Sequence, residues 1–184
     1  RACSGWFLVV RHYEDKYRLA YLAYDAMQNA DVIIRRLREM RGGKPNASIR
    51  PDLTRWIQEW THAPDETAFW QALNGHILPE LHRQLQADHE KLDPSANANE
   101  ARLLREIQNR LDTGPNAPSR RIPVDEENPW LRYLRRYHER LGGLHGPEVP
   151  ALETPERPGT GTFQRPRTLY FDERIHIGPL MAYE

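Results

Sequence analysis

The sequence predicts an all-α protein: a helical bundle over residues 1–112, followed by a proline-rich, mostly irregular C-terminal extension over residues 113–184. Three observations predict this class. In the first part, apolar side chains recur at spacings of three and four, the period of one helical face. Glycine and proline separate these periodic stretches, and 10 of the 15 prolines lie after residue 113. This order of elements favours packed helices around one core, with an appended tail.

The longest periodic stretch covers residues 12–41, which contain neither glycine nor proline. It predicts one long helix with a wide buried face, closed by Gly42 and Gly43, whose backbone readily adopts the left-handed conformation of a helix end. Four tyrosines recur along this helix at helical spacing, and such a stripe is typical of a core or an interface. They are Tyr13, Tyr17, Tyr21 and Tyr24.

Two further helices are expected, one at residues 52–61 with Asp52 as its N-cap, and one over residues 67–85. Pro79 interrupts the second, because proline lacks an amide donor and clashes with the preceding helical turn. We therefore expect a bend near residues 76–80.

A fourth helix is expected at residues 101–111, ended by the Gly-Pro pair at 114–115. Within the extension, residues 129–141 have the one further helical pattern, and we expect this helix to pack on the bundle. Residues 142–168 are predicted to form a linker or an extended tail. Residues 168–177 are expected to form a short strand or an arm.

The charges of the chain balance, with 26 basic and 26 acidic side chains. A neutral chain lacks the net attraction that nonspecific binding to nucleic acid or anionic membranes uses. The densest basic region runs from residue 102 to residue 140, but its arginines are interleaved with glutamates. This pattern predicts a solvated, salt-bridged surface, so nucleic acid is not an expected partner.

Cys3 is the only cysteine, which excludes an internal disulfide and predicts a reduced, cytoplasmic protein. The longest apolar run near the start, at residues 6–10, is far shorter than the roughly 20 residues that span a membrane, so no membrane association is expected. The chain begins with Arg1 and ends shortly after an apolar run, as a piece of a longer protein would.

Helical bundles build metal centres from inward carboxylates and histidines, often with E-x-x-H pairs. None of four candidate pairs supplies that motif: His12 with Asp15, Asp25 with Asn29, His76 with Glu80, and His89 with Asp93. We expect His76 and Glu80 to be an exposed polar pair. Asp25 and Asn29 are expected either to be hydrogen-bonded inside the bundle or to lie at its rim, because an uncompensated buried carboxylate is costly. No phosphate-binding loop or hydrolase motif predicts a catalytic residue.

Residues 24–31 (Tyr-Asp-Ala-Met-Gln-Asn-Ala-Asp) and 36–41 (Arg-Leu-Arg-Glu-Met-Arg) resemble a helix of a group of bacterial ferritin-like proteins of unassigned function. That helix reads W-E-D-A-x-H-A-D and then R-L-R-E-L-R. Residues 62–79 and 93–104 are similar to later segments of the group in order and spacing. The resemblance covers about residues 11–111.

The resemblance implies a ferritin-like bundle, a scaffold that in other members can hold a di-iron or related metal centre. Here Asp25 stands at the group's Glu and Asn29 at its His, and losing the imidazole makes a poor iron site. The metal-ligand positions are therefore degenerate, with these candidate ligands: Asp25, Asn29, Glu14, Glu80 and His82.

Two functional hypotheses follow. The first is a metal-poor ferritin-like domain that acts by binding another protein, a second copy of itself in a homo-oligomer, or a small molecule. The alternative is a non-haem oxidase or oxygenase of the di-iron type, with iron or another transition metal held by Asp25 and by residues such as Glu14, Glu80 and His82.

Overall fold

The computed structural model describes residues 2–40, 50–93, 95–117, 123–144 and 154–158, and all regular structure within them is helical. The all-α class is thereby confirmed. Gly42, Gly43 and residues 168–177 lie outside the described residues. In chain order the elements are α1 (Ala2–Phe7), α2 (Tyr13–Glu39), α3 (Pro51–Thr61), α4 (Glu66–Ala72), the π-helical segment η1 (Leu73–Ile77), α5 (Leu78–Glu90), α6 (Ala98–Thr113) and α7 (Pro129–Arg140).

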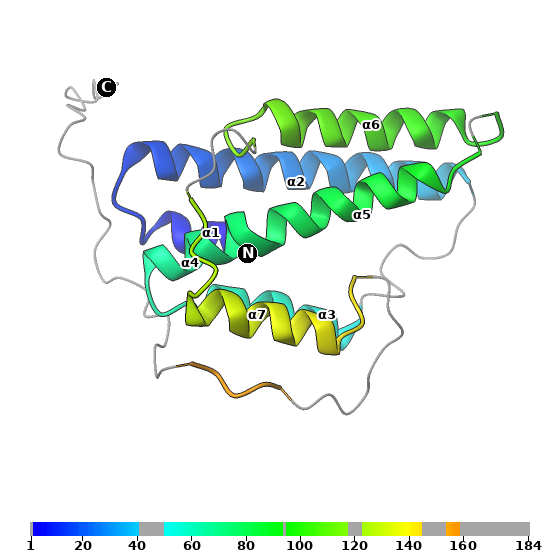
Figure 1. Ribbon diagram of the computed structural model, residues 1–184. Coiled ribbons are helices and arrows are strands. Elements are labelled where there is room, and N and C mark those ends of the chain that lie inside the picture. The colour runs from blue at the N-terminus through cyan, green and yellow to red at the C-terminus, as the bar shows by residue number, and fades with distance from the viewer. Residues whose placement is uncertain (1, 41–49, 94, 118–122, 145–153, 159–184) are drawn as a thin grey trace, which may run out of the picture.

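The helices form two pairs joined by an oblique middle helix. Figure 1 shows α2 and α6 side by side along one edge of the molecule, and α3 and α7 side by side along the opposite edge. Between the pairs, α5 continues from α4 and η1 and packs against α6. The short α1, which the sequence pattern did not predict, bridges α2 and α3. None of the described helices is both long and apolar enough to cross a membrane.

An aromatic stack closes the core where α1, α3 and α4 meet. The ring of Phe69, with no exposed surface, lies between Trp6 and Trp60, at centroid distances of 4.6 and 5.0 Å. The indole N–H of Trp6 also donates to the main-chain oxygen of Thr61 at 3.2 Å. Such stacked aromatic pairs add stability beyond the area they bury, so this stack anchors α1 to the bundle.

Close to the predicted bend, the chain departs from the α-helical pattern and forms a π-helix, Leu73–Ile77. Pro79 has no N–H to bond the oxygen of Gly75 four residues earlier, and the preceding turn widens so that the amide of Leu78 bonds the oxygen of Leu73. Gly75 also admits a close neighbour, since a Cβ atom there would lie 3.0 Å from a methyl group of Leu131 on α7. Proline and glycine thus shape the surface that α7 packs against.

The helix α7 supplies a large share of the core. Asn128 caps its start through its side-chain oxygen, and its inner face buries apolar residues against α3, α4 and η1. They are Trp130, Leu131, Tyr133, Leu134 and Tyr137. The core of the described residues therefore draws on both predicted parts, the bundle at residues 1–112 and the extension at residues 113–184.

The predicted N-cap at Asp52 is wrong. The helix α3 begins one residue earlier, at Pro51, because the missing N–H of proline costs nothing in the first helical turn. Asp52 instead lies buried in that turn, in a bidentate ion pair with Arg50. The guanidinium of Arg50 also donates to the main-chain oxygens of Leu141 and Gly143, which ties α3 to the end of α7.

Candidate functional site

Asp25, the first predicted metal ligand, sits in a closed polar network. Its side chain is buried and accepts a hydrogen bond from Asn29 Nδ2 at 3.1 Å. Arg110 on α6 donates to Asn29 Oδ1 at 3.0 Å and lies 3.7 Å from Asp25 Oδ1. The amide and the guanidinium together compensate the buried carboxylate, so the network joins α2 to α6.

These groups do not fit a di-iron centre. The guanidinium of Arg110 already supplies positive charge beside the carboxylate of Asp25, and it would repel a metal ion at the same place. Asn29 offers only a neutral amide oxygen, and that oxygen already accepts from Arg110. The donor set therefore favours an ion-pair network over metal ligation.

The other predicted ligands lie apart from Asp25. Glu14 is exposed in the first turn of α2, whereas Glu80 on α5 pairs with Arg83. His82, also on α5, has Nδ1 3.4 Å from an oxygen of Asp112 on α6. Within the described parts of the chain, no three His, Cys, Asp or Glu side chains are grouped so as to hold one metal ion.

One E-x-x-H pair, Glu59 with His62 at the end of α3, escaped the expectations drawn from the sequence. The structure commits Glu59 to other partners. Its carboxylate accepts three hydrogen bonds from Arg157, at 2.7 to 3.0 Å, and one from the hydroxyl of Tyr133 at 2.9 Å. Burial and the adjacent carboxylate raise the pKa of Tyr133 above its ordinary value, which keeps the hydroxyl protonated as a donor.

The expectation that His76 and Glu80 form an exposed pair is wrong, because α7 covers both. The Glu80 side chain is only 12% exposed, and His138 on α7 brings its Nε2 to 4.0 Å from the Glu80 carboxylate. The ring of His138 stacks on Trp56 at 4.8 Å and meets the ring of His76 edge-on at 4.9 Å. We refer to His76, Glu80, His138 and Trp56 as the histidine cluster.

Both imidazoles of the histidine cluster are held neutral. Burial, together with nearby His138 and Arg135, lowers the pKa of His76 to about 4, while Glu80 opposes this shift. Burial likewise lowers the pKa of His138. The Nε2 atom of each ring is buried and makes no hydrogen bond within the described parts of the chain. Hydrogen bonds from Arg83 lower the pKa of Glu80, so the cluster contains one carboxylate and two neutral rings at pH 7.

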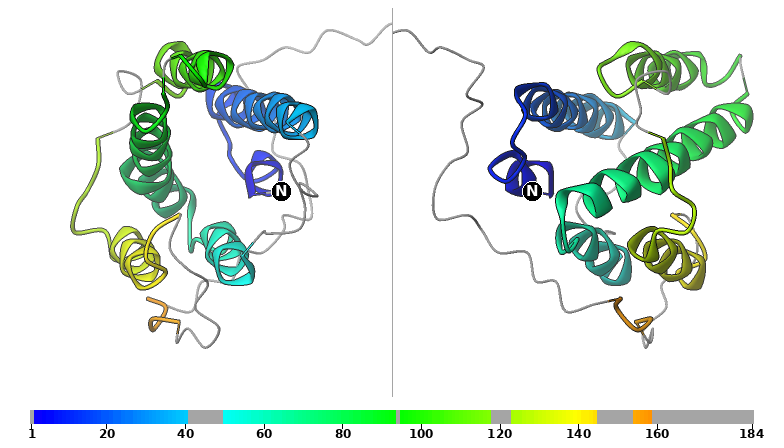
Figure 2. Two further views of the ribbon diagram at one scale, coloured as in Figure 1. Left: turned by 90° about the vertical axis from the view of Figure 1, so that its right-hand side faces the viewer. Right: turned by 60° about the vertical axis from the view of Figure 1, so that its left-hand side comes forward.

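A separate feature is the exposed aromatic face of α2. Tyr13, Tyr17, Tyr24 and Met27 are 53%, 52%, 63% and 72% exposed. We call this line of four residues the outer α2 face. Three tyrosines of the predicted stripe are thus exposed, because α1 and α6 cover the other sides of α2, whereas Tyr21 is half-buried. Figure 2 shows α2 at the edge of the described bundle, next to both helices.

A small apolar hollow borders the outer α2 face. It has a volume of about 180 Å³ and lies between α1 and α2. Its walls come from Cys3, Phe7, Leu19, Ala20 and Ala23. The exposed apolar surface of α2 therefore continues onto α1, where Phe7 is itself 38% exposed.

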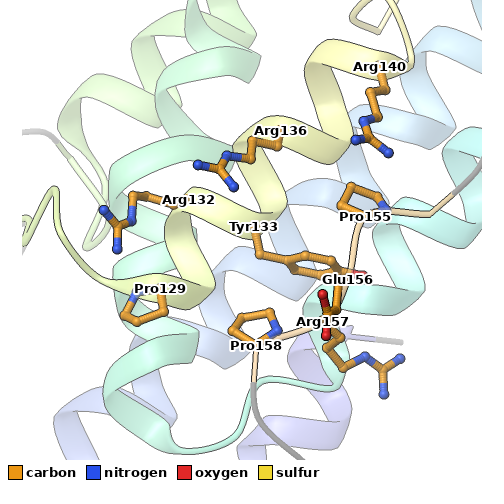
Figure 3. Close-up of a pocket in the computed structure, with 9 residues that line it drawn as sticks. All are labelled: Pro129, Arg132, Tyr133, Arg136, Arg140, Pro155, Glu156, Arg157 and Pro158. Atoms are coloured by element: carbon orange, nitrogen blue, oxygen red, sulfur yellow. The ribbon is translucent and has the colours of Figure 1, made fainter.

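A groove with a volume of about 610 Å³ lies between α7 and the segment 154–158. Three arginines, Arg132, Arg136 and Arg140, line it at intervals of one helical turn along α7 (Figure 3). Arg132 pairs with Glu127, as the interleaved charges predicted, but Arg136 makes no ion pair with a described residue. The groove thus gathers positive charge on a chain that is neutral overall.

No protein-family model, curated protein or solved structure matches the chain. The resemblance to bacterial ferritin-like proteins therefore stays a prediction from the sequence.

His138 and Arg110 are two further site residues that the sequence pattern did not single out. His138 follows Leu134 by four residues, so its place on the buried face of α7 could have been inferred from the helical period. Its contact with His76, and that of Arg110 with Asp25, joins helices far apart in the sequence, and no local pattern encodes either pairing.

Proposed function

We propose that this chain is a helical interaction domain and that the outer α2 face is its protein-binding surface. The observation that carries the proposal is the exposure of three tyrosines and a methionine, each by more than half, in one line along a single helix. Tyrosine and methionine are enriched in protein interfaces, and contiguous apolar patches on soluble proteins commonly mark binding sites. Tyrosine also contributes contact area with few side-chain torsions to immobilise.

The helix that carries this face is rigidly held, which lowers the cost of binding. On its inner side, α2 buries Leu19 and the carboxylate of Asp25. Close packing fixes it further, since a Cβ atom at Gly114 would lie 2.9 Å from the ring of Tyr21. A partner would therefore meet a preformed surface.

Site-specific photo-crosslinking tests this function. A benzophenone amino acid at position 24 should give discrete crosslinked products in the cells that express the chain. The same group at Ile57, which is 44% exposed on α3, is the matched control and should give none. Equal labelling at both positions, or no product at position 24, would show that the outer α2 face is not a binding surface.

The ferritin-like architecture and the di-iron oxidase activity remain proposals that rest on the sequence alone. Of the two hypotheses, the binding domain is better supported, because the Asp25–Asn29–Arg110 network uses the carboxylate that an iron site would need. The oxidase alternative would require Arg110 to leave that carboxylate.

A second candidate function is anion binding in the groove of α7. The evenly spaced Arg132, Arg136 and Arg140 favour it, because guanidinium groups bind phosphates and carboxylates through paired hydrogen bonds. Calorimetric titration with inorganic pyrophosphate tests it. Binding should weaken at least several-fold in Arg136→Gln and stay unchanged in Arg102→Gln, an exposed arginine on α6; no measurable heat with the unaltered chain would exclude the site.

A further inference from the structure

We infer that the partner of the outer α2 face is a second copy of this chain, packed with its α2 antiparallel to the first. The inference rests on the proposed function and names its partner. It follows from the spacing, the chemistry and the polarity of the side chains along α2.

The outer α2 face is part of a coiled-coil repeat along α2. Its four residues belong to a series in which successive members are alternately four and three positions apart, which is the spacing of helices that pack along their whole length. We call this series the seam: Tyr13, Tyr17, Ala20, Tyr24, Met27, Asp31, Ile34 and Arg38. In the structure seven of the eight seam residues are exposed and the eighth, Ile34, is partly exposed, so no described helix of the same chain covers the seam.

The spacing between successive seam residues is the same whether it is followed from the N-terminal or from the C-terminal end of α2. In an antiparallel pair, each seam residue therefore lies opposite another seam residue, with a two-fold axis between Tyr24 and Met27. A face that pairs with itself around a two-fold axis is the usual interface of a homodimer. The seam extends over nearly all of α2, whose 27 residues make a helix about 40 Å long.

Charge complementarity selects the antiparallel arrangement. The first half of the seam is aromatic, whereas the second half ends in Arg38, next to Arg35 on the same side of α2. Antiparallel packing places Tyr13 beside the partner's Arg38, where the guanidinium can lie over the ring, and Tyr17 opposite the partner's Ile34, where two apolar side chains meet. Parallel packing would instead bring arginines of the two copies together and leave them to repel.

The centre of the seam is also complementary. Around the two-fold axis, Tyr24 lies opposite the partner's Met27, and a thioether packs favourably against an aromatic ring. Ala20 lies opposite the partner's Asp31, where its small side chain leaves room for the ion pair that Asp31 makes with Arg35 at 2.6 Å. Each seam position thus meets a neighbour that suits it in size and charge.

Light scattering on the full chain over a range of concentrations gives the first test. The expected mass is twice that of the chain. Tyr24→Arg should raise the dissociation constant of the dimer at least tenfold without changing the circular dichroism spectrum. Ile57→Arg, at a position on α3 that is 44% exposed, should leave the dimer intact. A monomer at every concentration, or equal weakening by both variants, would overturn the inference.

Disulfide trapping tests the orientation in a Cys3→Ala background. Chains with Tyr13→Cys and chains with Arg38→Cys should form a mixed disulfide when combined, because only antiparallel packing brings these positions within bonding distance. Disulfides between two identical variants would instead indicate parallel packing and overturn the inference.

If the benzophenone at position 24 crosslinks only to other proteins, the second copy is excluded while the proposed function survives; if it crosslinks to nothing, both fail.

Discussion

Arg135 on α7 donates a hydrogen bond from Nη2 to the main-chain oxygen of Gly75 over 2.8 Å. That oxygen lacks its usual helical donor because Pro79, four residues later, has no N–H. One helix thus completes the hydrogen bonding of another at the π-helical bend. The contact also sets α7 against η1, where His138 meets His76.

Replacing Arg135 with methionine should lower the free energy of unfolding by about 1–3 kcal/mol, because it leaves the Gly75 oxygen without a protein donor. The same change removes the exposed ion pair of Arg135 with Glu126, which contributes little. Urea denaturation monitored by circular dichroism measures the effect.

Two companion variants show whether the Gly75 contact is the cause. Arg132→Met removes only an exposed pair with Glu127 and should cost less than about 1 kcal/mol. Pro79→Ala restores an amide that can reach the Gly75 oxygen, so Arg135→Met should cost less in that background. If Arg135→Met lowers the free energy of unfolding equally in both backgrounds, the Gly75 oxygen does not depend on Arg135 for its hydrogen bond.

The histidine cluster predicts that stability falls as the pH drops from about 6.5 toward 4. The folded chain holds His76 neutral with a pKa of about 4, whereas the unfolded chain protonates it near the ordinary value of 6.5. The unfolded state therefore binds more protons in this range, and acid favours unfolding by about 2–3 kcal/mol in all. The lowered pKa of His138 acts in the same direction.

Urea denaturation of the unaltered chain and of His76→Gln between pH 8 and pH 5 isolates the contribution of His76. The carboxyls of Glu80, Glu100 and Glu126 have lowered pKa values, so their stabilising contribution is lost only below their ordinary value of 4.5. In His76→Gln the slope of stability against pH should become shallower over this range. An unchanged slope would mean that His76 titrates alike in the folded and unfolded states.

Iron loading tests the account of Asp25. Because Arg110 occupies the charge-balancing position beside Asp25, we expect protein expressed with added iron to carry well below one metal ion per chain by elemental analysis. The small amount found should be the same in Asp25→Ala. Near two ions per chain, lost in that variant, would instead establish the di-iron alternative.

Local sequence pattern was enough to place α2, α3, α6 and α7 to within a few residues, because helical period, prolines and glycines act over one or two turns. The prediction of an irregular turn before Pro79 rests on the same local effects of proline. The short α1 escaped prediction because six residues are too few to show a period.

The contacts of the candidate sites could not be predicted in this way. Apolar spacing marks a face of α2 but not whether another helix covers it, so the tyrosine stripe looked equally suited to a core or an interface. The Asp25–Arg110 and His76–His138 pairs depend on which helices meet. That arrangement is set by packing between distant segments, and a single sequence does not display it.

The most direct test of the interaction surface compares the peroxide oxidation of Met27 and Met40 by mass spectrometry as the chain is concentrated. Both methionines are exposed, at 72% and 48%, but only Met27 belongs to the seam. Oxidation requires access to the sulfur, so a covered methionine reacts more slowly. The account predicts that Met27 becomes several-fold slower to oxidise with rising concentration while Met40 does not change; equal rates for Met27 at all concentrations would contradict it.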